Sequence, residues 1–296
     1  MKVLNFGSLN IDYVYSVDHI MREGETQACT KMERFCGGKG MNQSIALAKA
    51  GVGVLHAGMV GADGEWLLEM CQKSGVDTRY IRKTDGKSGH TIIQVDKNAQ
   101  NCILLYGGAN REITEEYIDE VLNEFEKGDI ILLQNEVNLL DKIIEKAYEK
   151  EMIIILNPSP MDEVIKKCDL HKITILLLNE IEGEQITGVT DPGKILDKLN
   201  ALYPDMKVVL TLGRNGSVYQ EKEKRCTQDV FPVKPVDTTA AGDTFTGYFI
   251  ASVLEGMPVE KGMQMAAKAA SIAVSRKGAA VSVPYRKEVE ETLQVR

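Results

Sequence analysis

Short, almost wholly apolar runs recur along the chain and set its predicted architecture. They lie at residues 3–8, 54–61, 129–135, 152–158, 173–179 and 207–213. Continuous apolar runs of this length are typical of strands that are buried on both faces of a parallel sheet. Helically spaced apolar positions occupy several of the segments between them, namely residues 41–51, 64–75, 114–128 and 138–150. This alternation predicts a three-layer α/β/α sandwich with a mostly parallel sheet.

Two segments interrupt this alternation. Residues 11–36 and 88–106 are rich in β-branched and aromatic residues with partial alternation, which is typical of half-exposed antiparallel strands. We expect them to form a small β-sheet lid, because both leave the main fold at strand ends, where α/β proteins bind ligands. The main α/β domain then comprises residues 1–10, 37–87 and 107–296. The open face of such a sheet favours self-association.

Composition narrows the possible partners. The 296 residues include 43 acidic and 35 basic side chains, with a formal net charge of −8 and no concentrated basic block, so no nucleic-acid partner is expected. The chain has no run of 18 apolar residues and starts directly in a strand-like segment, so we expect a cytoplasmic protein with no membrane partner. Six cysteines without a CxxC pair and four histidines without HExxH spacing favour neither disulfides nor structural zinc.

The first candidate for ligand binding is the glycine-rich segment CGGKGMNQ, residues 36–43. Standard nucleotide loops are missing from the sequence, which has no GxxxxGK[ST] and no GxGxxG after the first strand. The glycines at 36–43 permit close approach of a ligand to the backbone, and Asn42 can both donate to and accept from vicinal hydroxyls. An ordinary glycine-rich turn with a solvated Lys39 explains the same pattern equally well.

The second candidate is GSLNID, residues 7–12, at the end of the first predicted strand. Strand alternation places Asn10 and Asp12 on the same side. An amide and a carboxylate beside a glycine-rich turn suit a polyol, whose hydroxyls both donate and accept. Asn and Asp are also common as plain turn residues after a strand, which is the alternative explanation.

The third candidate is VDTTAAGDTFTG, residues 236–247, which leads into an apolar helical stretch. Ala240, Ala241 and Gly242 have almost no side chain, so a phosphoryl group could reach the backbone N–H groups at the helix start. Asp243 would stand beside that group and could accept a proton from an attacking hydroxyl. The alternative is an acid that only stabilises the helix N-terminus.

Taken together, these segments resemble a known family. GSLNID, CGGKGMNQ, LNPSP, LLNEIE, TLGRNG, VDTTAAGDTFTG and AVSRKGAAVSVP occur in the order and at about the spacing found in ribokinase-like sugar kinases, the PfkB family. The resemblance extends over essentially the whole chain. It implies an enzyme that uses ATP, Mg²⁺ and K⁺, with a four-stranded lid sheet through which two copies form a homodimer.

The resemblance also implies roles for individual residues. Asp243 matches the catalytic base, and the anion hole for the γ-phosphate is matched by Ala240, Ala241 and Gly242. The positions that hold the sugar are matched by Asn10, Asp12, Gly38, Lys39, Asn42 and Glu136. Positions near the nucleotide and its phosphates are matched by Asn179, Glu182, Thr211 and Gly213, with Glu182 in the Mg²⁺ region. Oxygens around a potassium ion, mostly backbone carbonyls, are matched by Asp237, Thr239, Ala273, Arg276, Gly278 and Ser282.

The implied reaction is transfer of the γ-phosphate of ATP to the primary 5-hydroxyl of D-ribose or a closely related free sugar. Four positions depart from the family pattern. Trp66 replaces a glycine, Ala266 stands where a histidine can face the adenine, and SGHT places His90 and Thr91 where small apolar side chains would face the sugar. His90 could instead face a base, so the alternatives are a nucleoside kinase or a sugar-binding sensor without catalysis.

Overall fold

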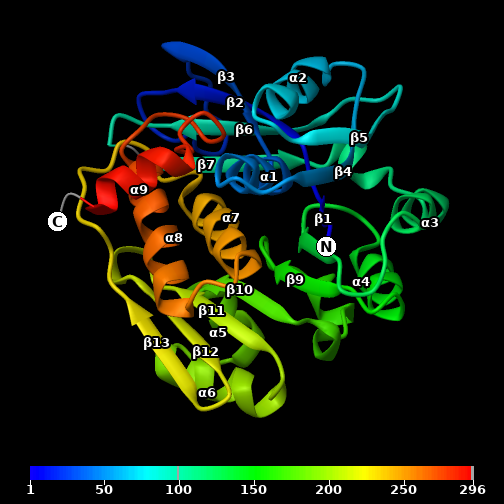
Figure 1. The fold of residues 1–296 in the computed structure, drawn as a ribbon. Helices are drawn as coiled ribbons and strands as arrows, with labels where there is room; N and C mark the ends of the chain where they lie inside the picture. The colour runs from blue at the N-terminus through cyan, green and yellow to red at the C-terminus, as the bar shows by residue number, and fades with distance from the viewer. Residues whose placement is uncertain (99, 295–296) are drawn as a thin grey trace.

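The computed structural model describes residues 1–98 and 100–294 and contains a large and a small sheet within them (Figure 1). The large sheet has nine strands. In spatial order they are β13 (Lys224–Gln228), β12 (Ser217–Glu221), β11 (Lys207–Thr211), β10 (Ile175–Asn179), β9 (Ile153–Asn157), β8 (Ile130–Gln134), β1 (Val3–Phe6), β4 (Val54–Val60) and β5 (Asp77–Lys83). All neighbours pair in parallel except β11 with β12 and β12 with β13.

Helices cover both faces of this sheet. They are α1 (Lys39–Lys49), α2 (Glu65–Lys73), α3 (Glu115–Leu122), α4 (Leu140–Glu149), α5 (Glu180–Thr187), α6 (Pro192–Leu202), α7 (Ala241–Leu254), α8 (Val259–Val274) and α9 (Arg286–Gln294). Short 3-10 turns occur at Gly108–Arg111, Ile165–Lys167, Leu170–Lys172 and Gly213–Asn215. None of the helices in the described part of the chain is long and apolar enough to span a membrane.

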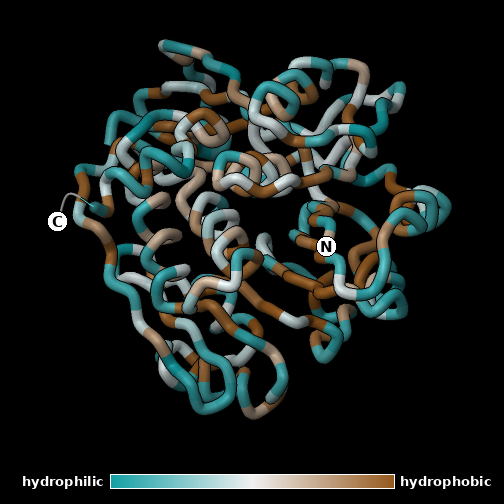
Figure 2. The backbone as a smooth tube through the Cα atoms, viewed as in Figure 1, coloured by the Kyte–Doolittle hydropathy of each residue, from teal (hydrophilic) through white to brown (hydrophobic). Residues whose placement is uncertain are grey.

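Two hydrophobic cores lie on opposite faces of the large sheet. Strand alternation divides β8 between them, because Ile130 and Leu132 join one core and Ile131 and Leu133 join the other. The first core includes side chains of α1, α2, α7, α8 and α9, and the second includes side chains of α3, α4 and α6. Figure 2 shows the apolar segments gathered inside a hydrophilic exterior. The predicted three-layer sandwich with a mostly parallel sheet is confirmed.

The small sheet has the strand order β3 (Lys31–Gly37), β2 (Asn10–Ser16), β6 (Gly89–Val95) and β7 (Asn101–Tyr106). Its outer pairs are antiparallel, but its central pair, β2 with β6, is parallel. The predicted small sheet is confirmed and two of its three pairs are antiparallel, but the parallel central pair was not expected. The reason is topological, because β2 and β6 both leave the large sheet in the same direction, after β1 and β5 respectively, and a long stretch of chain separates them.

Residues 90 and 91 of β6 lie on opposite faces of the small sheet, as adjacent strand residues must. The Thr91 hydroxyl donates to Asp12 Oδ1 at 2.5 Å, on the face that carries Asn10 and Asp12. The His90 ring instead packs edge-on to Tyr13 and against Tyr106, with centroid separations of 5.9 and 4.9 Å. The expectation that both side chains face the sugar was therefore wrong for His90.

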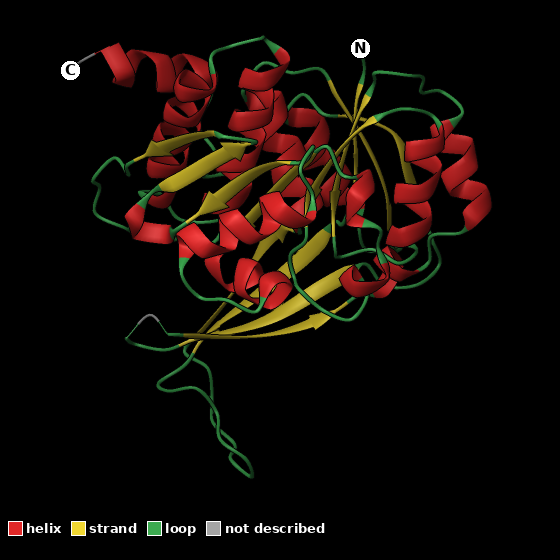
Figure 3. Ribbon diagram, turned by 90° about the horizontal axis from the view of Figure 1, so that it is seen from below, coloured by secondary structure: helices red, strands yellow, loops and turns green. Residues whose placement is uncertain are grey.

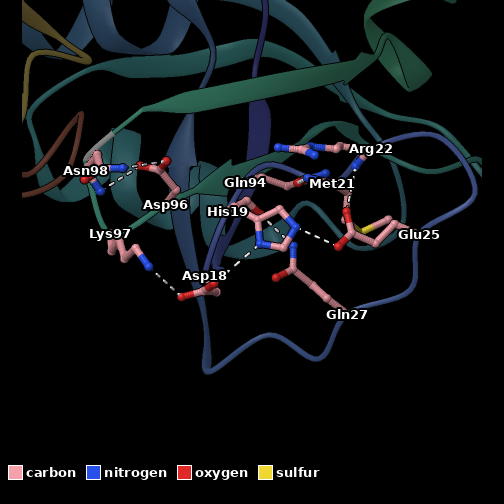
Figure 4. Close-up of polar contacts among 10 residues, drawn as sticks. All are labelled: Asp18, His19, Met21, Arg22, Glu25, Gln27, Gln94, Asp96, Lys97 and Asn98. Atoms are coloured by element: carbon pink, nitrogen blue, oxygen red, sulfur yellow. Dashed lines mark hydrogen bonds and ion pairs between the residues drawn. The ribbon is translucent and has the colours of Figure 1, made fainter.

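A long loop joins β2 to β3 and projects beyond the small sheet (Figure 3). His19 organises it, because its Nε2 lies 2.6 Å from Glu25 Oε1 and its backbone carbonyl accepts from Gln27 Nε2 at 2.6 Å (Figure 4). The Met21 N–H donates to the Gln94 side chain at 3.0 Å and so attaches the loop to β6. The loop is therefore held by its own polar contacts and one strand of the small sheet.

Candidate active site

A pocket opens at the carboxyl ends of the central strands, where α/β folds usually bind ligands. It is lined by Lys39, Asn157, Ser159, Leu177, Leu178, Asn179, Glu182, Thr211, Thr239, Gly242, Asp243 and Thr246. These residues come from the end of β9, β10 and β11 and from the starts of α1, α5 and α7. Seven of the residues selected from the sequence line this pocket, from segments that are far apart along the chain.

Asp243 lies in the first turn of α7 and is almost completely buried. Its Oδ1 accepts a hydrogen bond from Gln43 Nε2 at 2.9 Å, and its Oδ2 accepts one from Asn42 Nδ2 at 3.0 Å. Both donors belong to α1, so the motif at 36–43 and the motif at 236–247 meet at this carboxylate. Asn42 Oδ1 has no hydrogen-bond partner among the described residues, which leaves it available to a ligand hydroxyl.

The start of α7 presents open backbone to the pocket. Ala240 is the N-cap residue, and within the described chain no side chain caps this helix end. A Cβ built on Gly242 would meet nothing within 4 Å, so there is free space in front of the helix start. Uncapped N–H groups and the positive end of the helix dipole form a natural anion site. The acid of Asp243 lies within the same turn.

Lys39 is the cation of the pocket. Burial lowers the pKa of its ammonium group, but Asp243, Glu136 and Glu182 together raise it, and the net pKa lies above its ordinary value. Glu136 accepts from the Lys39 backbone N–H at 3.0 Å and from the Ser8 hydroxyl, which ties the turn at 36–43 to the end of β8. Gly38 enters α1 with φ +92°, a backbone conformation that favours glycine. Lys39 is therefore a fixed positive charge among three carboxylates.

Asn10 and Asp12 lie on one face of β2 and are both buried. Asn10 Oδ1 accepts from Asn110 Nδ2 at 2.7 Å. Asp12 lies directly over Gly37, where any Cβ would come within 1.9 Å of Asp12 Oδ2. Burial raises the pKa of Asp12 to about 6, although the Thr91 hydrogen bond opposes this shift. The glycine-rich turn thus makes room for the carboxylate that β2 supplies.

Asn179 and Glu182 form a capping box at the start of α5. The Glu182 N–H donates to Asn179 Oδ1 at 2.9 Å, and the Asn179 N–H donates to Glu182 Oε2 at 3.0 Å. Glu182 is buried and lines the pocket, so a helix-capping role and a ligand role are compatible here. Thr211 ends β11 beside Asn179, and Gly213 turns the chain with φ +53°.

The six residues matched to a potassium site come from the loop before α7, the last turn of α8 and the loop that follows α8. Asp237 Oδ1 accepts from the Thr239 N–H and hydroxyl at 3.0 and 2.5 Å, and Asp237 Oδ2 accepts from the Gly278 N–H at 3.0 Å. The Ala273 carbonyl already accepts from the Arg276 N–H at 3.0 Å. The Arg276 guanidinium pairs with Glu288, so only its backbone is free to serve a ligand. Ser282 is buried, and its hydroxyl donates to the Ala279 carbonyl at 2.7 Å; no hydrogen bond joins it to Asp237 among the described residues.

Two polar residues of this region, Gln43 and Asn110, were not among the residues selected from the sequence. Gln43 contacts Asp243 and also donates to Asn157 Oδ1 at 3.3 Å. Asn110 holds both Asn10 and the Leu9 N–H, the latter at 3.0 Å. A signal was present for Gln43, which follows Asn42 directly in the motif, but its direction depends on how α1 packs against α7. Asn110 gave no local signal, because it lies in a short 3-10 turn 100 residues from its partner.

Comparison with known proteins gives a consistent assignment. A family model for pfkB family carbohydrate kinases matches residues 1–286. The ribokinase of Bacillus subtilis (strain 168) is 35% identical over 291 residues, covering 97% of each chain, and that of Haemophilus influenzae is 32% identical over 301 residues, covering 97% of each. The structure of Arabidopsis thaliana ribokinase with ribose and ATP has a TM-score of 0.88 and 30% identity, covering 99% of this chain and 98% of that one. This chain belongs to the pfkB family of carbohydrate kinases.

Proposed function

We propose that this protein is an ATP-dependent sugar kinase that transfers the γ-phosphate to the primary 5-hydroxyl of D-ribose or a closely related free sugar. The observation that carries the proposal is the position of Asp243. It lies at an uncapped helix start, beside open space, and is held by two amide donors of the glycine-rich motif. The similarity to ribokinases over nearly the whole chain supports the choice of substrate class.

The proposed reaction needs one base and a site for the transferred group. Asp243 accepts the proton of the sugar hydroxyl as its oxygen attacks the γ-phosphorus, and the bond from that phosphorus to the β-phosphate oxygen breaks to release ADP. Ala240, Ala241 and Gly242 form the proposed anion hole, which binds the charge that develops on the phosphoryl oxygens; of its N–H groups, that of Ala241 already donates to the Thr238 carbonyl at 3.2 Å. Lys39 adds a fixed positive charge close to Asp243. Alignment and charge neutralisation account for most of the catalysis in such transfers.

The sugar-binding set that we propose faces Asp243 from the small sheet and from α1. Asn10, Asp12 and Asn42 are buried, and with Glu136 they supply acceptors for several hydroxyl donors. Gly38 and Lys39 would complete this set through the backbone. A phosphorylated sugar would meet these carboxylates as like charges. An uncharged polyol is therefore the ligand that this set fits.

The residues present fit a nucleotide with Mg²⁺. Among the described residues no group of three or more His, Cys, Asp or Glu side chains could hold a metal by itself. Magnesium in nucleotide sites commonly relies on one or two carboxylates together with the substrate phosphates, and Glu182 offers such a carboxylate in the pocket. When bound, the ion neutralises phosphate charge. Asn179, Thr211 and Gly213 are the proposed neighbours of the nucleotide.

We also propose a potassium site between the loops that Asp237 joins. Asp237 connects the two loops next to the start of α7, because its carboxylate accepts from the Thr239 and Gly278 N–H groups, and the proposed ligands of the ion are oxygens of these loops. Such a set suits a large, weakly hydrated cation, whose charge strengthens the neighbouring anion site. The proposed ligands are Asp237, Thr239, Ala273, Arg276, Gly278 and Ser282.

Residues 11–36 and 88–106 are the proposed lid, and residues 1–10, 37–87 and 107–296 the proposed main domain. The nucleoside-kinase alternative depended on a side chain that could face a base. His90 lies on the far face of β6 from Asp12, which removes that argument. The alternative of a silent sensor is disfavoured because Asp243 and Gly242 both line the pocket.

The test is a panel of ribose, 2-deoxyribose, hexoses and nucleosides, each incubated with MgATP while ADP release and sugar phosphate are measured. We expect ribose to exceed 2-deoxyribose by at least ~10-fold in kcat/KM, because a buried acceptor without its hydroxyl loses about 1.5–3 kcal/mol. In Asp243→Asn, kcat should fall roughly 10²–10⁴-fold while the fold persists.

Two results would contradict the proposal. A nucleoside that exceeds ribose by a similar margin would favour the nucleoside kinase instead. If Asp243→Asn keeps near-normal turnover and loses about 1 kcal/mol in the free energy of unfolding, Asp243 is not the catalytic base and only stabilises the helix N-terminus.

A further inference from the structure

A continuous chain of buried amide side chains leads from the centre of the large sheet to Asp243. Asn5 of β1 and Gln134 of β8 occupy strand positions that face α1, and both are fully buried. Gln134 Nε2 donates to Asn5 Oδ1 at 3.0 Å and to Gln43 Oε1 at 2.7 Å. Gln43 Nε2 then donates to Asp243 Oδ1 at 2.9 Å. Neither Asn5 nor Gln134 touches Asp243, yet both are connected to it through Gln43.

The direction of every hydrogen bond in this series of amides is set at the end away from Asp243. The Gly40 backbone carbonyl can only accept, and Asn5 Nδ2 donates to it at 2.7 Å, so Asn5 must present its oxygen to Gln134. Gln134 therefore presents its amide nitrogen to both partners, and Gln43 receives it on Oε1. The Gln43 nitrogen is consequently turned toward Asp243. Each amide group in the chain uses both of its N–H hydrogens.

A second fixed acceptor acts at the other end. Asn157 Nδ2 donates to the Leu177 carbonyl at 2.8 Å, so Asn157 presents its oxygen to Gln43. The Gln43 nitrogen donates to that oxygen at 3.3 Å, a longer contact than the 2.7 Å bond from Gln134. Both ends therefore favour the same orientation of the Gln43 amide, and the shorter bond is the one from Gln134.

This arrangement leaves one buried acceptor unmatched. The two hydrogen bonds from Gln134 Nε2 fix the orientation of its amide, and in this orientation Gln134 Oε1 has no hydrogen-bond partner among the described residues. The oxygen lies against Gly7, where any Cβ would come within 2.2 Å of it. Buried polar atoms without a partner are uncommon, and each calls for a physical reason. Orientation of Gln43 supplies that reason.

We propose that Gln43 is a positioning residue for the base Asp243, and that Gln134 acts through Gln43 by fixing which end of its amide faces the carboxylate. The inference rests on the proposed function. With the amide reversed, the Gln43 carbonyl oxygen would face Asp243 Oδ1, and the two partial negative charges would repel each other. The carboxylate would then rotate away from the position in which it can take the proton of the sugar hydroxyl.

The test compares Gln134→Met, Gln43→Met and the double variant, all with MgATP and ribose. Gln134→Met keeps the volume of the side chain but removes both donors. We expect kcat to fall about 10-fold in Gln134→Met and ~100-fold in Gln43→Met, since small displacements of a catalytic group reduce rates on this scale. KM for ribose should change by less than about threefold, because neither residue belongs to the proposed sugar-binding set.

The double variant distinguishes positioning from general damage. If Gln134 acts only through Gln43, the double variant should match Gln43→Met in kcat within about twofold. Independent losses that multiply would contradict the proposal. The matched control is Gln220→Met, which replaces another buried glutamine on β12, away from the pocket, and should leave kcat unchanged.

Folding and the proposed function are controlled separately. Circular dichroism and thermal melts report whether Gln134→Met folds, and Gln134→Asn serves if it does not, because its shorter amide cannot span the same two partners. A folded Gln134 variant with wild-type kcat would overturn the positioning proposal. A wild-type enzyme that phosphorylates no sugar would instead overturn the proposed function, before any variant is compared.

Discussion

Asp12 is the carboxylate of the site whose environment changes its chemistry most clearly. Burial raises its pKa to about 6, with smaller contributions from the charges of Glu136 and Asp243, while the Thr91 hydroxyl lowers it. Thr91 also occupies one oxygen of Asp12, which leaves Oδ2 to accept a ligand hydroxyl. An ionised carboxylate accepts hydrogen bonds at both oxygens, whereas protonation turns one oxygen into a donor and removes the charge, so the state of Asp12 should control how tightly the sugar binds.

This gives a prediction for pH. The pKa of Asp12 in the free enzyme lies near 6, so Asp12 is ionised above that value and protonated below it. We therefore expect kcat/KM for ribose to fall as the pH decreases through about 6, since this parameter reports the free enzyme. In Thr91→Val the group that lowers the pKa is lost, so the fall should begin at a higher pH.

The measurement is kcat/KM between pH 5 and 8 for the wild type, Thr91→Val and Thr91→Ser. Thr91→Ser keeps the hydroxyl and serves as the control, with a profile close to wild type. A Thr91→Val profile that overlays the wild type would show that the hydrogen bond to Asp12 does not influence binding. A shift to lower pH would contradict the sign of the argument.

At the scale of elements, Asp237 joins the two loops that precede α7 and follow α8. One carboxylate oxygen accepts from Thr239 and the other from the Gly278 N–H. Whatever binds between these loops is therefore coupled to the start of α7, where we place the phosphoryl group. A monovalent cation should strengthen that anion site without taking part in proton transfer.

We expect activity to rise when K⁺ replaces Na⁺ at equal ionic strength. Asp237→Asn removes the negative charge but can still accept from the Gly278 N–H, so it should lose most of the preference for K⁺ while remaining folded. The assay is the initial rate with saturating ribose and MgATP in matched chloride salts. Equal wild-type rates in the two salts would contradict a working cation site in these loops.

The elements show how far sequence reasoning reaches. Continuous apolar runs in the sequence correctly predicted β1, β4 and β8 to β11, because strands that are buried on both faces of a parallel sheet have apolar residues at nearly every position. The same rule missed β5, β12 and β13, which have many polar positions and of which β5 and β13 are the edges of the large sheet. The predicted helix over 114–128 was also too long, because α3 ends at Leu122. Parallel pairing of β2 with β6 depends on contacts between segments over 70 residues apart, which no local pattern encodes.

The site shows the same limit. Residues clustered in short motifs, such as Asn42 and Asp243, could be selected because their chemistry is visible in a few adjacent letters. Asn5 and Gln134 interrupt otherwise apolar strands, so the sequence did contain a sign of a polar environment. Their connection to Asp243 could not be predicted, because it requires the packing of α1 against both the sheet and α7.

At the scale of the whole molecule, the small sheet touches the main fold at more than one place. The Lys277 ammonium lies 2.7 Å from Glu33 of β3 and 5.8 Å from the centroid of the Phe35 ring. Phe35 pairs with Asp12 across β2 and β3, so the loop that follows α8 contacts the strand next to the proposed sugar carboxylate. The small sheet is thus positioned by the same loop that contributes Gly278 to the proposed cation site.

The opposite edge of the small sheet is open. Every residue of β7 is exposed, including the apolar side chains of Ile103, Leu104, Leu105 and Tyr106. A contiguous apolar edge strand with unpaired backbone groups is a surface that proteins usually cover. We therefore expect two copies to associate through the small sheet and form a homodimer.

The prediction is tested by sedimentation velocity over a range of protein concentrations. The wild type should sediment as a dimer, and Leu104→Glu should shift it to a monomer, because this side chain is 67% exposed and a charge buried without a partner at an interface is costly. Leu202→Glu introduces the same charge at an exposed leucine at the end of α6, which packs on the large sheet and not on the small one. This control variant should remain dimeric. If both variants dissociate equally, the added charge itself weakens the dimer, and the result would not support an interface at β7. A wild type that is monomeric at all concentrations would contradict association through β7.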